Sequence, residues 1–343
     1  MKKVLSSICI GLLLMSMLGG CTKSNATNKT LYSTSSQKMH TACTKNNAIN
    51  KPFLNNSEEE VDKDYEDVFL MIQENYGVQR AWANAKEYFI LNDILRDKPK
   101  IFVYKNNKLL YSIDNDINNN GLYENIFFNP SGDKFVCQKL DKSKKQWQLD
   151  IFNAEDGVKE ETYFKQKNEH FVLLQWTEKG MIFRKYDGWE ERSKLIPKLF
   201  MLNQQKEFQE IWDYSHTPYE VCDINGEWAL LKNHDNKKFQ KINLHTKEIK
   251  DTNFNYDLIE TLCKGTNSYN SLDHLYYIYF YNSPNALVGQ ILYNDSYAIF
   301  LFKNEQMKII TENDFVGVTK DGVVYKKYTG DDGEGNIYVK LVN

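Results

Sequence analysis

The chain has little of what zinc enzymes and nucleic-acid-binding proteins use. Its 343 residues include only six His and six Cys, and its net charge is −3. The cysteines show no CxxC spacing and no His stands at ligand spacing from them, so the common zinc sites are not expected. A chain so close to neutral also lacks the basic surface that nucleic acid requires, and we expect no nucleic-acid partner.

Proline is scarce as well, with six residues, whereas the chain holds 22 Tyr and 19 Phe. That balance favours strands over helices, because aromatic side chains fit a half-buried pleated surface. Cys137 and Cys222 fall in strand-like runs, where a free Cys usually behaves as a small buried apolar residue. The sequence shows no catalytic motif and no motif for an organic cofactor, so it predicts location and architecture better than chemistry.

A long apolar run occurs only at the N-terminus, from Val4 to Met17. It is shorter than the roughly 20 residues that span a bilayer as a helix, and it is typical of a secretory signal. It is followed by Leu18–Cys21, with the sequence LGGC, which resembles the lipobox of bacterial lipoproteins. The resemblance implies a signal peptide over residues 1–20, lipid on the sulfur and the amine of Cys21, and anchoring to the extracytoplasmic face of the cell membrane.

Residues 21–56 are rich in Thr, Ser, Asn and Lys and hold few apolar side chains. Such a segment cannot bury enough surface to offset the entropy lost on ordering it, so we interpret it as a flexible tether. The remaining residues, 57–343, are numerous enough for one large hydrophobic core and are predicted to form the folded domain.

Four glycine-containing turns recur through the chain, and each is followed by a strand-like run. Their glycines are Gly132, Gly180, Gly226 and Gly322, which are separated by 48, 46 and 96 residues. Three further strand-like runs accompany each turn, so a unit of about 45 residues holds four short strands. This is the pattern of a β-propeller blade, and the sequence predicts an all-β, six-bladed β-propeller of four-stranded blades.

The fifth unit departs from the pattern, because its turn is the segment NSPN at 282. This alignment makes Asn253–Asp273 an insertion, with a short helix that ends at Gly265. A rival alignment places the turn near His274, but it gives the next two strands abnormal spacing.

The closure of the ring has two interpretations, because the last unit lacks an outer strand. The segment DVFLMIQE at 67 could supply that strand from the N-terminal side and remove an open sheet edge. Alternatively, Ser57 and Glu60 could cap a short helix over the same region. The uninterrupted apolar run Val68–Ile72 favours the strand.

One repeat matches a known family more closely than the others. The segment NPSGDKFV at 129 resembles the repeat of TolB-like and WD40-like bacterial propellers, and TKDGVVYK at 319 is a looser match. The resemblance implies the fold class. It implies no function, because propellers carry many unrelated activities.

In a propeller the long, irregular loops predicted here would gather on the face opposite the glycine turns. Four residues on these loops are candidates for binding a protein, a peptide or a cell-wall glycan: Tyr186, Trp189, Tyr214 and His216. An exposed Trp189 beside charged residues would suit such a contact, whereas the alternative is that its ring folds back onto the blade. His216 lies near Asp213, which would allow acid–base chemistry, but capping, turn formation or surface solvation is the favoured explanation.

A further loop on this face has the spacing of a cation site. Oxygen-bearing side chains alternate at Asp116, Asn118 and Asn120, followed by Gly121 and Glu124. The spacing resembles the calcium loops of some propeller blades, and alternating oxygens can wrap a hard cation. Calcium is therefore the one cofactor we consider, against the alternative of a polar, Asn-rich connection.

Together these features predict a lipid-anchored, extracytoplasmic lipoprotein that acts as a binding or scaffolding module. The alternative is a propeller enzyme, such as a glycan hydrolase or lyase, which would need carboxylates or His gathered at the mouth of the central channel.

Overall fold

The computed structural model describes residues 67–73, 80–85, 87–93, 99–115, 122–190, 193–263, 275–293, 296–329 and 335–342. They belong almost entirely to one unit, Asn50–Trp189 with Lys194–Asn343, and the fold below is that of this unit. Cys21 and the expected tether lie outside the described residues. No helix within the described ranges is long and apolar enough to cross a membrane.

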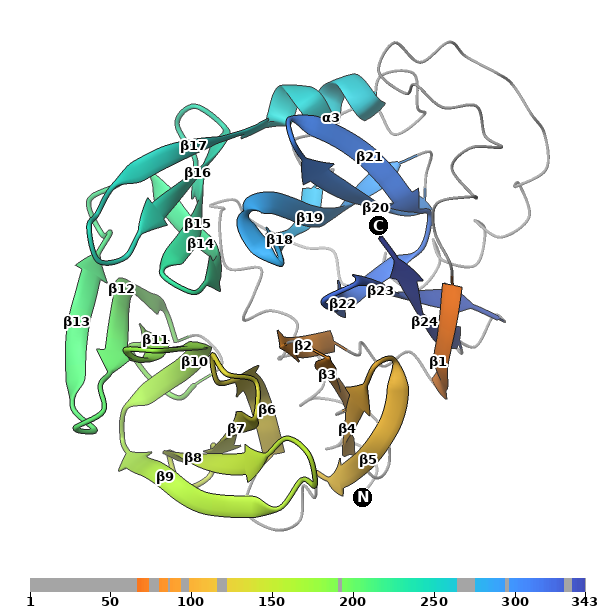
Figure 1. The fold of residues 1–343 in the computed structure, drawn as a ribbon. Helices are drawn as coiled ribbons and strands as arrows, with labels where there is room; N and C mark the ends of the chain where they lie inside the picture. Colours follow the sequence, from red (N-terminus) through yellow and green to blue (C-terminus); the bar gives the residue numbers. More distant parts are fainter. Residues whose placement is uncertain are drawn as a thin grey trace, which may run out of the picture. The chain divides into compact units, whose positions relative to one another are not determined.

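The described strands form six antiparallel blades around a central axis (Figure 1). Blade 1 contains β2 (Arg80–Ala85), β3 (Tyr88–Asp93), β4 (Lys100–Lys105) and β5 (Lys108–Asp114). Blade 2 contains β6 (Leu122–Phe128), β7 (Lys134–Asp141), β8 (Gln146–Asn153) and β9 (Lys159–Lys167). Blade 3 contains β10 (His170–Thr177), β11 (Gly180–Tyr186), β12 (Leu195–Leu202) and β13 (Phe208–Asp213). Blade 4 contains β14 (Tyr219–Asn225), β15 (Trp228–Asn233), β16 (Lys238–Asn243) and β17 (Ile249–Asn255). Blade 5 contains β18 (Leu275–Tyr281), β19 (Ser283–Tyr293), β20 (Ser296–Lys303) and β21 (Gln306–Thr311). Blade 6 contains β22 (Asp314–Val318), β23 (Gly322–Tyr328), β24 (Gly335–Leu341) and β1 (Asp67–Gln73).

The ring is closed by a strand from the N-terminal side. β1 pairs antiparallel with β24 and forms the outer strand of blade 6, so the strand interpretation of residues 67–73 is confirmed. A single parallel pair, Ala81 with Gly317, joins the inner strands of blades 1 and 6. Residues 57–66, where the alternative helix would begin, lie outside the described residues.

Two of the four turn glycines, Gly180 and Gly322, are required for a steric reason. A Cβ atom on Gly180 would come within 2.3 Å of the carbonyl oxygen of Leu202, and one on Gly322 within 2.2 Å of that of Lys340. At both positions the third strand of the blade approaches too closely for a side chain. The fifth turn falls at Asn282, with a φ of 55°, which confirms the NSPN alignment.

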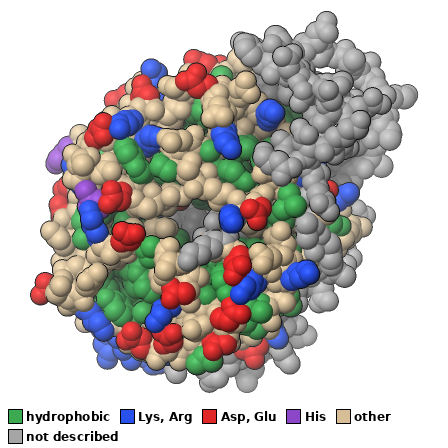
Figure 2. All heavy atoms as spheres, viewed as in Figure 1, with side chains coloured by type: hydrophobic (Ala, Val, Ile, Leu, Met, Phe, Trp, Pro, Cys, Tyr) green, Lys and Arg blue, Asp and Glu red, His purple; other side chains and the backbone are tan. Residues whose placement is uncertain are grey.

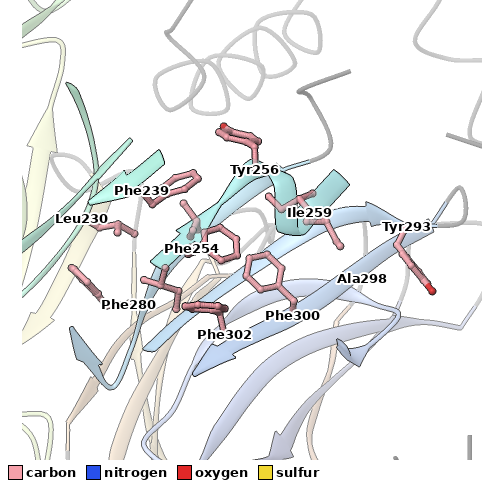
Figure 3. Close-up of a cluster of buried hydrophobic side chains, with 13 residues drawn as sticks. Leu230, Phe239, Phe254, Tyr256, Ile259, Phe280, Tyr293, Ala298, Phe300 and Phe302 are labelled. Carbon is pink, nitrogen blue, oxygen red and sulfur yellow. The ribbon is translucent and has the colours of Figure 1, made fainter. Parts of the chain in front are cut away.

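The core is divided into six apolar clusters, and each lies between two neighbouring blades. The one between blades 4 and 5 is rich in Phe and is shown in Figure 3. Helix α3 (Tyr256–Cys263) lies within the expected insertion and turns Tyr256 and Ile259 into this cluster. Because the apolar clusters lie between blades, each blade depends on its neighbours for burial.

Every inner strand carries a β-bulge near its start. The bulges fall between residues 81 and 83, 123 and 125, 173 and 175, 221 and 223, 275 and 277, and 315 and 317. A bulge leaves a backbone N–H without its ladder partner. In three blades an amide oxygen from the preceding blade accepts this N–H: Tyr123 donates to Asn115 at 2.8 Å, Leu173 to Gln138 at 2.9 Å, and Phe315 to Gln290 at 3.1 Å.

Candidate functional site

One face of the ring gathers the irregular loops, which we call the loop face. Successive strands of a blade run antiparallel, so the turns from second to third strand and the connections between blades all lie at this end. The glycine turns lie at the other end, the glycine-turn face. Figure 2 shows basic and acidic side chains interspersed around a central hollow, so the visible face has no single sign of charge.

Three ring side chains form an aromatic stack at the loop face of blade 3. His170 stacks on Tyr186 and on Trp189, with ring centroids 5.1 and 4.6 Å apart and planes inclined by 28° and 15°. Its Nδ1 lies 2.9 Å from the carbonyl oxygen of Gly188. Burial lowers the pKa of His170, so the ring is neutral at physiological pH.

Trp189 is half-buried in this stack rather than fully exposed. Its ring packs against the apolar cluster between blades 2 and 3, and its indole Nε1 has no hydrogen-bond partner among the described residues. Tyr186 is half-buried beside it. The two residues therefore present part of their rings to the loop face and part to the blade.

Tyr214 and His216 have different environments although they are two residues apart. Tyr214 is 5% exposed and belongs to the apolar cluster between blades 3 and 4, so we leave it out of the binding surface. His216 is exposed. The carboxylate of Asp213 accepts the Ser215 hydroxyl at 2.6 Å and pairs with Lys198 at 3.0 Å, and among the described residues no bond joins it to His216.

The residues expected to hold calcium are mostly outside the described ranges, since Asp116, Asn118 and Asn120 are not described. Glu124 is described at the bulge of β6, where burial raises the pKa of its carboxyl group. Within the described residues no group of three or more His, Cys, Asp or Glu side chains is placed to hold a metal ion. The calcium site stays a prediction.

Sequence reasoning missed a second aromatic surface on the loop face, which we call the tyrosine patch. It consists of Tyr276, Tyr297 and Tyr328, whose exposed fractions are 41%, 39% and 41%. The first two contact edge to face, with centroids 5.1 Å apart. They stand at the starts of β18 and β20 and at the end of β23, which are the loop-face ends of these strands.

The tyrosine patch has a charged pair at its base. The hydroxyl of Tyr328 donates to the carboxylate of Asp314, and the ammonium group of Lys326 lies 4.6 Å from the Tyr328 ring centre. Burial raises the pKa of Asp314 and lowers that of Lys326. Burial of Tyr297 raises the pKa of its hydroxyl to about 12, so this hydroxyl stays protonated and can donate a hydrogen bond.

Asp223 titrates unusually but is held in the blade interface. Burial raises the pKa of its carboxyl group to about 7, while its Oδ2 accepts the backbone N–H of Phe280 at 2.8 Å across blades 4 and 5. Burial also raises the thiol pKa values of Cys137 and Cys222, which are free. Neither thiol is therefore activated as a nucleophile, as expected for cysteines on buried strands.

Several solved structures are similar to this chain at low sequence identity. The propeller domain of the Trilobed protease from Pyrococcus furiosus is similar over 79% of this chain and 96% of its own, with 12% identity and a TM-score of 0.46. A putative TolB from Agrobacterium tumefaciens is similar over 78% and 90%, with 9% identity and a TM-score of 0.44. A putative exported protein from Bacteroides fragilis is similar over 82% and 96%, with 12% identity and a TM-score of 0.46.

No family model matches the sequence, and no curated protein sequence matches it. The chain is an all-β, six-bladed β-propeller with TolB-like structural neighbours. Identity this low does not carry an activity from one propeller to another, so function has to be argued from the loop face itself.

Proposed function

We propose that this protein is a membrane-anchored, extracytoplasmic lipoprotein whose loop face binds a glycan or a peptide of the cell envelope. The tyrosine patch is the observation that carries this proposal. Of its three exposed tyrosines, Tyr328 contacts the half-buried carboxylate of Asp314 and the buried ammonium group of Lys326, so flat apolar contact and directional hydrogen bonding are available together. Aromatic anchors of this kind dominate the energetics of binding surfaces.

The glycine-turn face offers a comparison. Its large exposed apolar side chains include Leu109 and Val158, which are 54% and 58% exposed. Both are aliphatic and stand at turns between third and fourth strands. Single exposed aliphatic residues are normal on a soluble surface and indicate no binding site.

The test uses the full-length protein in detergent and the insoluble wall fraction of the source organism. The double variant Tyr276→Ala, Tyr297→Ala should be retained at least about tenfold more weakly, since one anchor contributes about 2 kcal/mol or more. The matched variant Leu109→Ala, Val158→Ala should bind like the parent. Equal retention of all three proteins would refute a binding role for the tyrosine patch.

The membrane anchor is tested separately in cells. The variant Cys21→Ser should lose metabolic labelling by a fatty acid and appear in the medium, because the thioether needs the thiol. Labelling that persists in this variant would exclude Cys21 as the lipidated residue.

A glycan hydrolase or lyase is the alternative that the same experiment can distinguish. Release of reducing ends from the same wall fraction would support it. Retention without release supports the binding module.

A further inference from the structure

Arg184 on β11 carries a positive charge that no other described residue pairs with. Its side chain is half-buried, and within the described parts of the chain its guanidinium group makes no hydrogen bond and no ion pair. Three buried side-chain atoms lack a hydrogen-bond partner among the described residues, and two of them are Nε of Arg184 and Nε1 of Trp189. Buried polar atoms normally have partners, so two such donors in one blade need an explanation.

The sheet register places Arg184 directly below the aromatic stack. β10 and β11 pair His170 with Tyr186 and Val172 with Arg184. Alternate residues of a strand point to the same side of its sheet, so Arg184, Tyr186 and His170 share one side of blade 3. Ile182, two residues before Arg184, belongs to the apolar cluster between blades 3 and 4. This side therefore faces blade 4, and Arg184 lies one step deeper than the stack.

The titration of neighbouring groups agrees with this placement. Burial raises the pKa values of Tyr214 and Asp223, and the positive charge of Arg184 opposes the rise in both. Tyr186 also acts on Tyr214, whose pKa it raises. Arg184 and Tyr186 thus share one environment at the loop-face end of the interface between blades 3 and 4.

Two carboxylates of blade 4 belong to the same region, and both have other partners. Oδ2 of Asp223 accepts the backbone N–H of Phe280 in blade 5 at 2.8 Å. The carboxylate of Glu220 lies 3.5 Å from Nε2 of His234. Among the described residues neither carboxylate forms an ion pair with Arg184. Because arginine stays charged in proteins, its guanidinium group is available to an anion from outside the chain.

The aromatic stack adds a hydrogen-bond acceptor. Nδ1 of His170 lies 2.9 Å from the carbonyl oxygen of Gly188, which can only accept a hydrogen bond. The proton of the neutral ring is therefore on Nδ1, and Nε2 is an acceptor. Such an acceptor suits the hydroxyl group of a ligand.

We propose that Arg184 and the aromatic stack bind a sugar acid, with the carboxylate on the guanidinium group and the sugar ring beside Tyr186. The inference deepens the proposed binding role and rests on it. A guanidinium group matches a carboxylate with two parallel hydrogen bonds. The aromatic ring suits the apolar face of a sugar, and Nε2 of His170 suits a hydroxyl group. The carboxylate of a peptide would satisfy Arg184, but it brings no ring of hydroxyl groups to lie beside the stack.

The test measures binding of small ligands to the full-length protein in detergent by calorimetry. Glucuronate should bind at least about tenfold more tightly than glucose, and Arg184→Gln should abolish this preference. Arg184→Lys should restore only part of it, because an ammonium group lacks the planar fork. The control Lys237→Gln removes one exposed positive charge from the turn between β15 and β16 on the same face, and it should bind glucuronate like the parent.

An NMR titration locates the bound sugar. Glucuronate should shift the ring signals of His170 in the parent and leave those of the exposed His216 in place. In Arg184→Gln, whose folding is checked by urea denaturation, the same concentration should leave His170 unchanged. Tyr186→Ala should weaken glucuronate and glucose by the same factor, because the ring contacts the part that the two sugars share.

Four outcomes would overturn the inference. Glucuronate could bind no better than glucose, or Arg184→Gln and Lys237→Gln could lose the same affinity. Glucose 6-phosphate could bind more tightly than glucuronate, which would make the anion a phosphate, or N-acetylalanine could bind as tightly as glucuronate, which would make the ligand a peptide. None of these outcomes involves the tyrosine patch on blades 5 and 6, so retention on the wall fraction tests the proposed function separately.

Discussion

Blades 2 and 5 each contain a buried glutamine that accepts a backbone N–H of the next blade, but the side chains on their surfaces differ. Gln138 and Gln290 occupy equivalent positions on their second strands, and both are buried. Each accepts the bulge N–H of the next blade, from Leu173 and from Phe315. The loop face of the blade that follows the first carries the aromatic stack, whereas blade 5 and the blade that follows it carry the tyrosine patch.

The difference separates what the fold requires from what a ligand would require. The glutamines satisfy a backbone group that every inner-strand bulge creates, so they serve the ring. The side chains at the loop face satisfy no such requirement, and they differ in charge and ring content from blade to blade. We therefore infer specificity from the loop face and stability from the interfaces.

The largest effect is expected from removing these glutamines. Gln138→Leu would leave the carbonyl of Phe171, the N–H of Leu173 and the amide of Asn125 without this partner. At about 1–3 kcal/mol for each buried orphan, the free energy of unfolding should fall by about 3 kcal/mol or more. Gln290→Leu loses chiefly the N–H of Phe315 and should cost about 1–2 kcal/mol.

Urea denaturation measures both losses, and Gln209→Leu on the exposed part of β13 is the matched control, with an expected change within about 0.5 kcal/mol. If Gln138→Leu is no more destabilising than this control, the hydrogen bonds of the buried glutamine do not stabilise the ring.

A smaller effect of opposite sign is expected at the interface of blades 4 and 5, where Asp223 performs a similar task with a carboxylate. A folded-state pKa of about 7, raised from 3.8, means that the ionised form opposes folding. Stability should therefore fall as the pH rises from about 4 to about 7, and it should stay low above that. The variant Asp223→Asn keeps an acceptor for the Phe280 N–H and carries no charge.

The Asp223→Asn variant should be more stable than the parent at pH 8 by roughly 2 kcal/mol. That is less than the full pKa difference implies, because the charge-assisted bond is lost as well. Thermal unfolding at pH 4, 6 and 8 measures this difference. A parent protein whose stability rises through this range would show that the carboxylate is ionised without penalty.

The sequence was sufficient to predict the ring of blades, because the strongest repeated pattern in it follows from a steric requirement. Gly180 and Gly322 repeat where the third strand excludes a side chain, and the apolar run in residues 68–72 predicted the closing strand β1. The inner-strand bulges could not be foreseen. They have no sequence signature of their own, and only the register between strands reveals that Gln138 and Gln290 are equivalent.

The candidate site was predicted less well than the fold. Trp189 and Tyr186 do lie on the loop face, but whether a ring stands free or stacks on His170 depends on the register between β10 and β11, which pairs His170 with Tyr186. The tyrosine patch was hidden because its members come from three strands of two blades. The density of Tyr in the segment LYYIYFY of β18 was the available signal, and alternation alone does not tell which of them is exposed.

The smallest effect is expected in the aromatic stack, and it distinguishes a ligand platform from packing. Burial is the main cause of the lowered pKa of His170, and the Trp189 ring supplies part of that burial through the stack. In Trp189→Ala water reaches the imidazole, so an NMR titration should show the His170 pKa moving up towards its usual 6.5, while Trp189→Phe keeps it low. Because a lowered folded-state pKa of His means that stability is lost as the pH falls below about 6.5, this acid loss should be weaker in Trp189→Ala. The direct cost of losing the stack should be only about 1 kcal/mol. A His170 pKa that is the same in the parent and in Trp189→Ala would mean that the ring does not shield the imidazole, and it would contradict this prediction.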